Sequence, residues 1–141
     1  MTIDTKFINL FSNVTTKAAL ASHNYVGKKD KIAADKAAVD SMRIELNKLN
    51  MRGQIVIGEG ELDEAPMLYI GEKLGNNDGP ELDIAVDPLE GTNFVANNLP
   101  GALSVIAVSE KNNLFNAPET YMEKIATKVK EKGVVDLDFD I

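Results

Sequence analysis

Apolar side chains near the start of the chain recur at helical spacing. Phe7, Phe11, Val14 and Ala18 are separated by three or four residues, so they would share one face of a helix with 3.6 residues per turn. This pattern predicts an amphipathic helix over residues 3–25.

A second helix is expected over residues 32–49, where Ala, Val, Met, Ile and Leu supply the apolar positions. Asp30 lies just before it, where a carboxylate can accept hydrogen bonds from the free N–H groups of the first turn. Gly27 is expected to cap the end of the first helix. Residues 28–31 then form a short basic loop, which by itself would be only a solvated linker.

After residue 50 the helical spacing gives way to short apolar runs. We predict strands over residues 54–57, 82–87 and 102–108, and a short helix over residues 94–98. The 102–108 run carries no charge, which favours a buried, central strand. Helices followed by strands predict an α/β fold in layers, with paired N-terminal helices packed on a mixed β-sheet.

The other stretches give weaker patterns. Residues 66–74 are apolar, but periodicity does not separate a strand from a short helix there, and residues 75–80 are a loop. Residues 125–129 are expected to extend a strand. Residues 134–141 alternate acidic and apolar side chains, which favours an amphipathic strand with its acids in water. A calcium-binding loop is disfavoured because its glycine and distal glutamate are missing.

The composition is that of one ordinary globular domain. Of the 141 residues, 44% are hydrophobic and 26% are charged, which is enough to bury a core. The chain contains no cysteine, which excludes disulfides and thiolate metal ligands, and its net charge of −7 argues against a nucleic-acid partner. No apolar run approaches ~18 residues, so no membrane span is expected. The single histidine, His23, is expected at the surface rather than in a metal site.

The strand predicted in the middle of the chain ends in the motif Asp-Pro-Leu-Glu-Gly-Thr. Pro88 biases Asp87 toward an extended conformation, so the carboxylate is expected at the end of the strand. Glu90 can face the same point if the chain turns. Gly91 permits close approach to a ligand, and Thr92 adds a hydroxyl and an N–H group suited to phosphate. Two oxygen ligands beside an anion site suit Mg²⁺-assisted phosphoryl chemistry.

A second acidic turn follows the predicted strand over residues 54–57. Gly58-Glu59-Gly60-Glu61 places two carboxylates between glycines, which presents acids at the edge of a sheet. The run is not a dinucleotide-binding fingerprint, because the third glycine is missing, and no phosphate-binding P-loop occurs in the chain. Taken alone, it could equally be an exposed acidic turn. Together with the acids of the first motif it favours a metal site.

These motifs together resemble a known family. Asp-Pro-Leu-Glu-Gly-Thr is similar to the D-P-[IL]-[DE]-G-T signature of the lithium-sensitive, metal-dependent sugar-phosphate phosphatases. Glu90 and the Gly-Glu-Gly-Glu run resemble the class II, bacterial-type fructose-1,6-bisphosphatases, and the resemblance continues through residues 64–72 and 116–124. The same two features disfavour an inositol-monophosphatase-like enzyme, the other member of the superfamily that we considered.

The resemblance implies a set of metal ligands. Asp35, Glu59, Asp87 and Glu90, with the main-chain carbonyl of Leu89, would bind Mg²⁺ or Mn²⁺. Oxygen ligands without His or Cys are also the set that these hard cations prefer. The family's Ala-Asp-Gly is Ala-Asp-Lys here, so a lysine stands next to the aspartate.

The remaining residues would handle the substrate, a sugar bisphosphate. Thr92 would orient the attacking water, Lys31 would lie near the reacting phosphate, and Glu59 would take part in catalysis. The substrate-binding residues would be Glu90, Gly91, Thr92 and Tyr121. The reaction implied is hydrolysis of the 1-phosphate of fructose 1,6-bisphosphate to fructose 6-phosphate and phosphate, in gluconeogenesis.

Members of this family are considerably longer than this chain. We therefore expect residues 1–141 to be the N-terminal metal- and phosphate-binding domain, with the C-terminal domain absent and little or no activity of the chain alone. Sedoheptulose 1,7-bisphosphate as a substrate and a non-catalytic metal-binding or assembly module are the alternatives. A cytoplasmic homo-oligomer, without a nucleic-acid or membrane partner, is expected.

Overall fold

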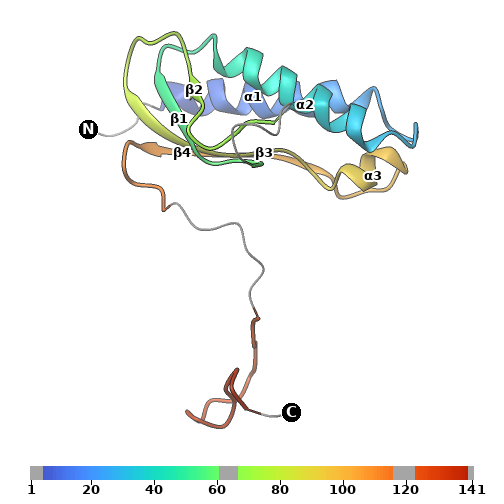
Figure 1. The fold of residues 1–141 in the computed structure, drawn as a ribbon, viewed down its shortest axis with the longest axis vertical. Helices are drawn as coiled ribbons and strands as arrows, with labels where there is room; N and C mark the ends of the chain where they lie inside the picture. The colour runs from blue at the N-terminus through green and yellow to red at the C-terminus, as the bar shows by residue number, and fades with distance from the viewer. Residues whose placement is uncertain (1–4, 61–66, 116–122, 140–141) are drawn as a thin grey trace.

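The computed structural model describes residues 5–60, 67–115 and 123–139 (Figure 1). The elements in chain order are α1 (Lys6–His23), α2 (Lys31–Leu46), β1 (Arg52–Ile57), β2 (Lys73–Leu74), β3 (Glu81–Glu90), α3 (Thr92–Ala96) and β4 (Leu103–Glu110). Both long helices and the predicted strands before residue 115 are therefore present, with ends that differ by a few residues from the prediction.

The strands form one mixed sheet in the order β2-β1-β3-β4. β1 and β3 run parallel to each other. β2 pairs antiparallel with β1, and β4 pairs antiparallel with β3. α1 and α2 pack on each other and on β3, and Figure 1 shows the two helices lying along one side of the sheet. The predicted layered α/β fold with paired helices on a mixed sheet is confirmed. In the described ranges, no helix combines the length and the apolar character that a membrane crossing requires.

The boundaries of the helices follow local chemistry. Asp30 caps α2 as predicted, because its Oδ1 accepts a hydrogen bond from the N–H of Ala33 at 2.9 Å. α1 ends at His23 with Asn24 as its C-cap, so the prediction that Gly27 caps this helix is wrong. Gly27 instead lies in the following turn with φ 74°, and its N–H donates to the carbonyl of Val95 at 2.9 Å.

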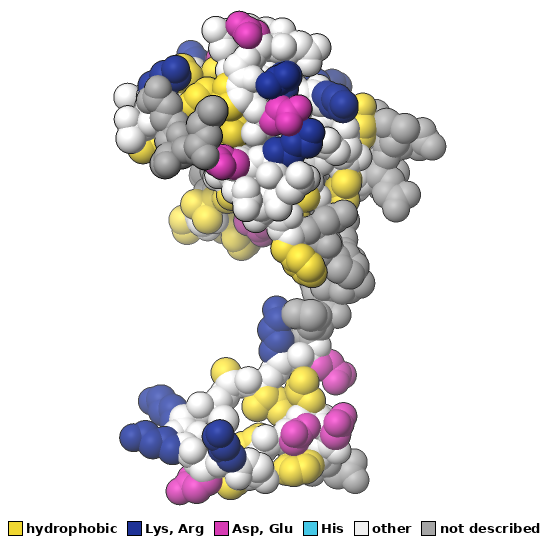
Figure 2. Space-filling model, turned by 90° about the vertical axis from the view of Figure 1, so that its left-hand side faces the viewer, with side chains coloured by type: hydrophobic (Ala, Val, Ile, Leu, Met, Phe, Trp, Pro, Cys, Tyr) yellow, Lys and Arg dark blue, Asp and Glu magenta, His cyan; other side chains and the backbone are white. Residues whose placement is uncertain are grey.

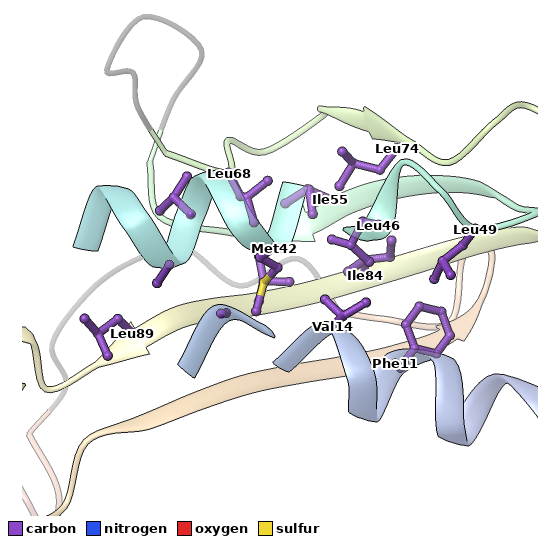
Figure 3. Packing of buried hydrophobic residues seen from close by; sticks show 14 of the residues in the cluster. Phe11, Val14, Met42, Leu46, Leu49, Ile55, Leu68, Leu74, Ile84 and Leu89 are labelled. Carbon is purple, nitrogen blue, oxygen red and sulfur yellow. The ribbon is translucent and has the colours of Figure 1, made fainter. Parts of the chain in front are cut away.

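The core lies between the two helices and the sheet. Figure 3 shows Met42 and Leu46 from α2 gathered with Ile55 and Ile84 from the sheet, and Val14 contributes from α1. All five side chains are fully buried, and burial of each stabilises the fold by roughly 1.5–3 kcal/mol. The apolar spacing in the helices therefore marks the side that meets the sheet.

The predicted central position of one strand is wrong, and the structure decides part of one stretch that the sequence left open. β4 lies at the edge of the described sheet, and its Leu103 and Val105 side chains are 60% and 45% exposed. Lack of charge therefore did not identify a central strand, because no described element covers that side of β4. Of the ambiguous stretch before residue 75, only Lys73–Leu74 is a strand.

The strands predicted over residues 125–129 and 134–141 are absent from the described part of the segment, residues 123–139. This segment runs away from the layered body in Figure 1 and shows apolar side chains among charged ones in Figure 2. Its apolar residues are exposed. Alternation alone does not make a strand, because a strand also needs a neighbour to complete its hydrogen bonds.

Candidate active site

Asp87 lies within β3 rather than at its end. The strand continues through Pro88 to Glu90, three residues beyond the prediction. Its pairing with β4 shifts between Asp87, which faces Val105, and Glu90, which faces Leu103, so β3 carries one extra residue there. A bulge of this kind bends a strand and re-aims its side chains, and it is frequent beside active sites.

Local contacts hold Asp87 in place. Its Oδ1 accepts a hydrogen bond from the N–H of Leu89 at 3.1 Å. Pro88 and Leu89 are both buried, while Asp87 itself is half-buried and Glu90 is exposed. Burial of Pro88 and Leu89 therefore anchors residues 87–90, while the carboxylates of Asp87 and Glu90 remain accessible to solvent.

Two other carboxylates influence the charge of Asp87. The pKa of Asp87 is raised to about 6, first by burial, then by the hydrogen bond and negative charge of Glu90, with a smaller contribution from the charge of Asp35. The N–H of Leu89 opposes this rise. Because like charges raise a carboxyl pKa only at short range, Glu90 and Asp35 each lie within electrostatic reach of Asp87, although Asp35 precedes Asp87 by 52 residues in the sequence.

Asp35 lies in the second turn of α2. It is half-buried, and burial raises its pKa. The lysine that follows it does not neutralise it: Lys36 pairs with Asp40 on the same helix, with Nζ and Oδ2 2.5 Å apart. The lysine of the Ala-Asp-Lys sequence is therefore paired with Asp40 rather than with Asp35.

The start of α2 is tied to α3. The N–H of Lys29 donates to the carbonyl of Ala96 at 2.9 Å, and its Nζ donates to Oδ1 of Asn97 at 2.8 Å. Lys31, the predicted phosphate neighbour, is the first residue of α2 and is exposed. Its position at the start of α2, beside α3, is compatible with the predicted role.

Gly91 and Thr92 form the junction between β3 and α3. Gly91 has φ 81°, and a Cβ there would lie 2.9 Å from Cδ2 of Phe94, so only glycine fits without strain. Thr92 is the half-buried first residue of α3. Since α3 has only five residues, phosphate binding here would depend on individual N–H groups rather than on a long helix dipole.

Glu59 lies just beyond the end of β1. β1 and β3 are parallel, and Ile57 pairs with Ala85. Glu59 follows Ile57 by two residues and Asp87 follows Ala85 by two, so the two acids lie level with each other, toward the carboxyl ends of the two strands. The N–H of Glu59 donates to the carbonyl of Leu68 at 3.0 Å, and its Oε2 is buried. The parallel pairing therefore brings the two acidic motifs to the same end of the sheet.

The described residues do not close a metal site. Among residues 5–60, 67–115 and 123–139, no three His, Asp or Glu side chains lie close enough together to hold a metal ion. The predicted substrate residue Tyr121, and Glu61 of the second acidic turn, lie outside the described residues. The structure therefore brings Glu90 and Asp35 within electrostatic reach of Asp87, but the described side chains do not form a complete set of ligands.

One pair of functional candidates was missed by the sequence analysis. Arg43 on α2 binds Glu72 through two hydrogen bonds, and this contact is the largest cause of the raised pKa of Arg43. Glu72 is 8% exposed. A single acid within the apolar stretch before Leu74 was the available signal, because a buried carboxylate requires a partner.

The fold is one seen in known structures. It is similar to the solved structure of an extragenic suppressor from Pyrococcus furiosus, with a TM-score of 0.51 and 16% sequence identity over 74% of this chain and 40% of that chain. At this identity the likeness shows the shared architecture only. The class defined so far is a layered α/β protein with acids at one end of its sheet.

The sequence comparisons identify the family. Residues 6–141 match the family of bacterial fructose-1,6-bisphosphatases encoded by glpX, and the chain belongs to this family. It is 53% identical over 131 residues to fructose-1,6-bisphosphatase 1 class 2 of Escherichia coli K12, covering 93% of this chain and 39% of that relative. It is 50% identical over 135 residues to the D-fructose 1,6-bisphosphatase class 2/sedoheptulose 1,7-bisphosphatase of Prochlorococcus marinus MIT 9303, covering 96% of this chain and 40% of that relative. The chain thus spans about two fifths of the length of these relatives.

Proposed function

We propose that this chain supplies the metal- and phosphate-binding part of an enzyme that hydrolyses the 1-phosphate of fructose 1,6-bisphosphate to fructose 6-phosphate and phosphate. The observation that carries the proposal is the parallel pairing of β1 and β3, which sets Glu59 level with Asp87. Asp87 also lies within electrostatic reach of Asp35 and Glu90, just before Gly91 and Thr92. Membership of the fructose-1,6-bisphosphatase family indicates the substrate.

The donor set suits a hard divalent cation. The charged form of Asp87, whose pKa is raised by burial and by the neighbouring Glu90 and Asp35, is stabilised when a cation lies beside it. All the predicted ligand atoms are oxygens. Mg²⁺ or Mn²⁺ would be held by Asp35, Glu59, Asp87 and Glu90, with the carbonyl of Leu89. When bound, such an ion supplies Lewis-acid polarisation of the phosphoryl group and lowers the pKa of a coordinated water.

The chain's own groups would position the substrate. The N–H groups of Gly91 and Thr92 would hold the phosphate, and the Thr92 hydroxyl would orient the attacking water for in-line displacement. Lys31 would add positive charge beside the phosphate, and Glu90 and Tyr121 would contact the sugar bisphosphate. No covalent intermediate is required.

A chimera tests this function directly. This chain would replace the matching N-terminal part of the Escherichia coli relative, and phosphate release from fructose 1,6-bisphosphate would be measured with Mn²⁺. Turnover is expected in the chimera, with a loss of about 100-fold or more for Asp87→Asn, since even groups that only support metal ligands can contribute up to about 100-fold. A folded chimera that binds Mn²⁺ without turnover would support the non-catalytic metal-binding module instead.

The 141-residue chain alone should bind Mn²⁺ weakly and release little phosphate, because its described residues leave the ligand set open. Robust turnover by the isolated chain would contradict this. We also propose that the enzyme is cytoplasmic and forms a homo-oligomer. Light scattering measures the oligomeric state.

Sedoheptulose 1,7-bisphosphate is a second candidate substrate. The observation in its favour is the dual name of the Prochlorococcus marinus relative, which is 50% identical to this chain. The ratio of kcat/KM for the two bisphosphates in the chimera decides between a single and a dual specificity.

A further inference from the structure

A charged pair links α2 to the segment that follows the second acidic turn. Nε of Arg43 lies 2.6 Å from Oε1 of Glu72, and Nη2 lies 3.1 Å from Oε2. Nη2 also donates to the main-chain carbonyl of Met67 at 2.6 Å. The two side chains are only 27% and 10% exposed, so the planar guanidinium holds both ends of residues 67–72 in a largely dry setting.

The segment held by Arg43 pairs with the end of β1. The N–H of Ile55 donates to the carbonyl of Glu72 at 2.9 Å, and the N–H of Glu59 donates to the carbonyl of Leu68 at 3.0 Å. Leu68 directly follows Met67, whose carbonyl Arg43 binds. A short path of hydrogen bonds therefore runs from the guanidinium to the backbone of Glu59.

The backbone at Gly58 packs closely against residues 67–72. A Cβ on Gly58 would lie 2.2 Å from the carbonyl oxygen of Leu68. Because the backbones are in close contact and hydrogen-bonded here, we expect a shift of residues 67–72 to disturb the backbone of Glu59. Oε2 of Glu59 is itself buried.

The same helix carries a second candidate ligand. Asp35 precedes Arg43 by eight residues on α2, or roughly 12 Å along the helix axis. α2 thus delivers Asp35 directly to the site and holds Glu59 through Arg43.

Stability alone does not account for this pair. Replacing a buried ion pair by apolar residues of similar volume is often neutral or stabilising, whereas groups that orient metal ligands commonly change metal affinity by 10- to 100-fold. We propose that Arg43, Glu72 and the Met67 carbonyl form a clamp that positions Glu59 to bind the divalent cation. Arg43 is a positioning residue in this scheme, which rests on the proposed function.

The test uses the 141-residue chain with the double variant Arg43→Met and Glu72→Met, which removes the clamp without leaving one buried charge alone. Mn²⁺ binding would be measured by electron paramagnetic resonance, and exchange of the Glu59 amide hydrogen by NMR without metal. The matched control is the double variant Lys111→Met and Glu81→Met, which removes an ion pair of 3.1 Å whose two side chains are about half exposed.

Loss of the clamp should weaken Mn²⁺ binding by about 10-fold and speed exchange at Glu59 by a similar factor, while the control variant changes neither. Unchanged exchange at Glu59 would overturn the clamp. Faster exchange with unchanged Mn²⁺ affinity would also overturn it, because the pair would then be only structural.

A third variant, Glu59→Gln, separates the clamp from the proposed function. If Glu59→Gln weakens Mn²⁺ binding and the clamp variant does not, the clamp alone is wrong. If Glu59→Gln has no effect, or the unmodified chain binds no Mn²⁺, the proposed metal site is wrong and the role of the clamp falls with it.

Discussion

The two acidic motifs lie at the same end of the sheet but are held in different ways. In β3, Asp87 is oriented by its own neighbours: the N–H of Leu89 bonds to it, and Pro88 is buried beneath. Glu59 is held by residues distant in sequence, through Leu68 and the Arg43–Glu72 pair. The proposed site therefore combines one carboxylate oriented by local chain geometry with another whose position depends on residues distant in the sequence.

The largest expected effect comes from breaking the remote support. Arg43→Met leaves Glu72 buried without its partner, which should lower the free energy of unfolding by about 3 kcal/mol. The double variant with Glu72→Met should stay within about 1 kcal/mol of the unmodified chain. Urea denaturation at pH 7 measures both, and equal losses in the single and double variants would contradict the ion-pair account.

The next effect tests the close approach beside Glu59. In Gly58→Ala the new Cβ would meet the Leu68 carbonyl oxygen at 2.2 Å, so the two segments must separate at a cost of about 2 kcal/mol. The matched control is Gly71→Ala in the same pair of segments. Its Cβ meets nothing within 4 Å, and only the φ of 91° opposes it, so about 1 kcal/mol is expected. Thermal unfolding of the two variants should rank them in this order.

A smaller, pH-dependent effect belongs to the locally held Asp87. Its pKa is raised to about 6 in the folded chain, so the folded state holds a proton that the unfolded state releases between about pH 4 and 6. Stability contributed by this group is therefore lost as the pH rises through that window.

Asp87→Asn removes this loss in the metal-free protein. The variant should be more stable than the unmodified chain at pH 7 by about 1 kcal/mol, a value reduced for solvent screening of a half-exposed group. The difference should shrink toward about pH 4 and vanish below it, where Asp87 becomes protonated in the unfolded chain as well as in the folded one. Urea titrations with EDTA at pH 4 and pH 7 measure it, and a pH-independent difference would rule out this titration as the cause.

The smallest effect is expected away from both motifs. Lys111 and Glu81 form an ion pair whose side chains are 49% and 46% exposed, so Lys111→Met should change stability by less than about 1 kcal/mol. High salt should abolish even that difference. A larger, salt-resistant loss would show that this edge of the sheet contributes more than an exposed pair can.

Much of the fold was predictable because its signals are local. Helical spacing identified both long helices, Asp30 was recognised as a cap, and the apolar run before Pro88 located β3. The prediction of β4 as a central strand was wrong because the burial of a strand depends on which elements cover it. The absence of charged residues does not reveal those elements. Alternation near the end of the chain misled for the same reason: residues 123–139 have no described strand beside them.

The sequence by itself determined the family, the two long helices, the strand that carries Asp87 and the types of residue available as ligands, since these depend on neighbours in the chain. Only the tertiary structure decided that Asp35 lies within electrostatic reach of Asp87, that β1 runs parallel to β3, and that Arg43 binds Glu72 and the carbonyl of Met67. These contacts join residues separated by tens of positions. Their formation depends on how the helices and the sheet pack together, which no single stretch of sequence encodes.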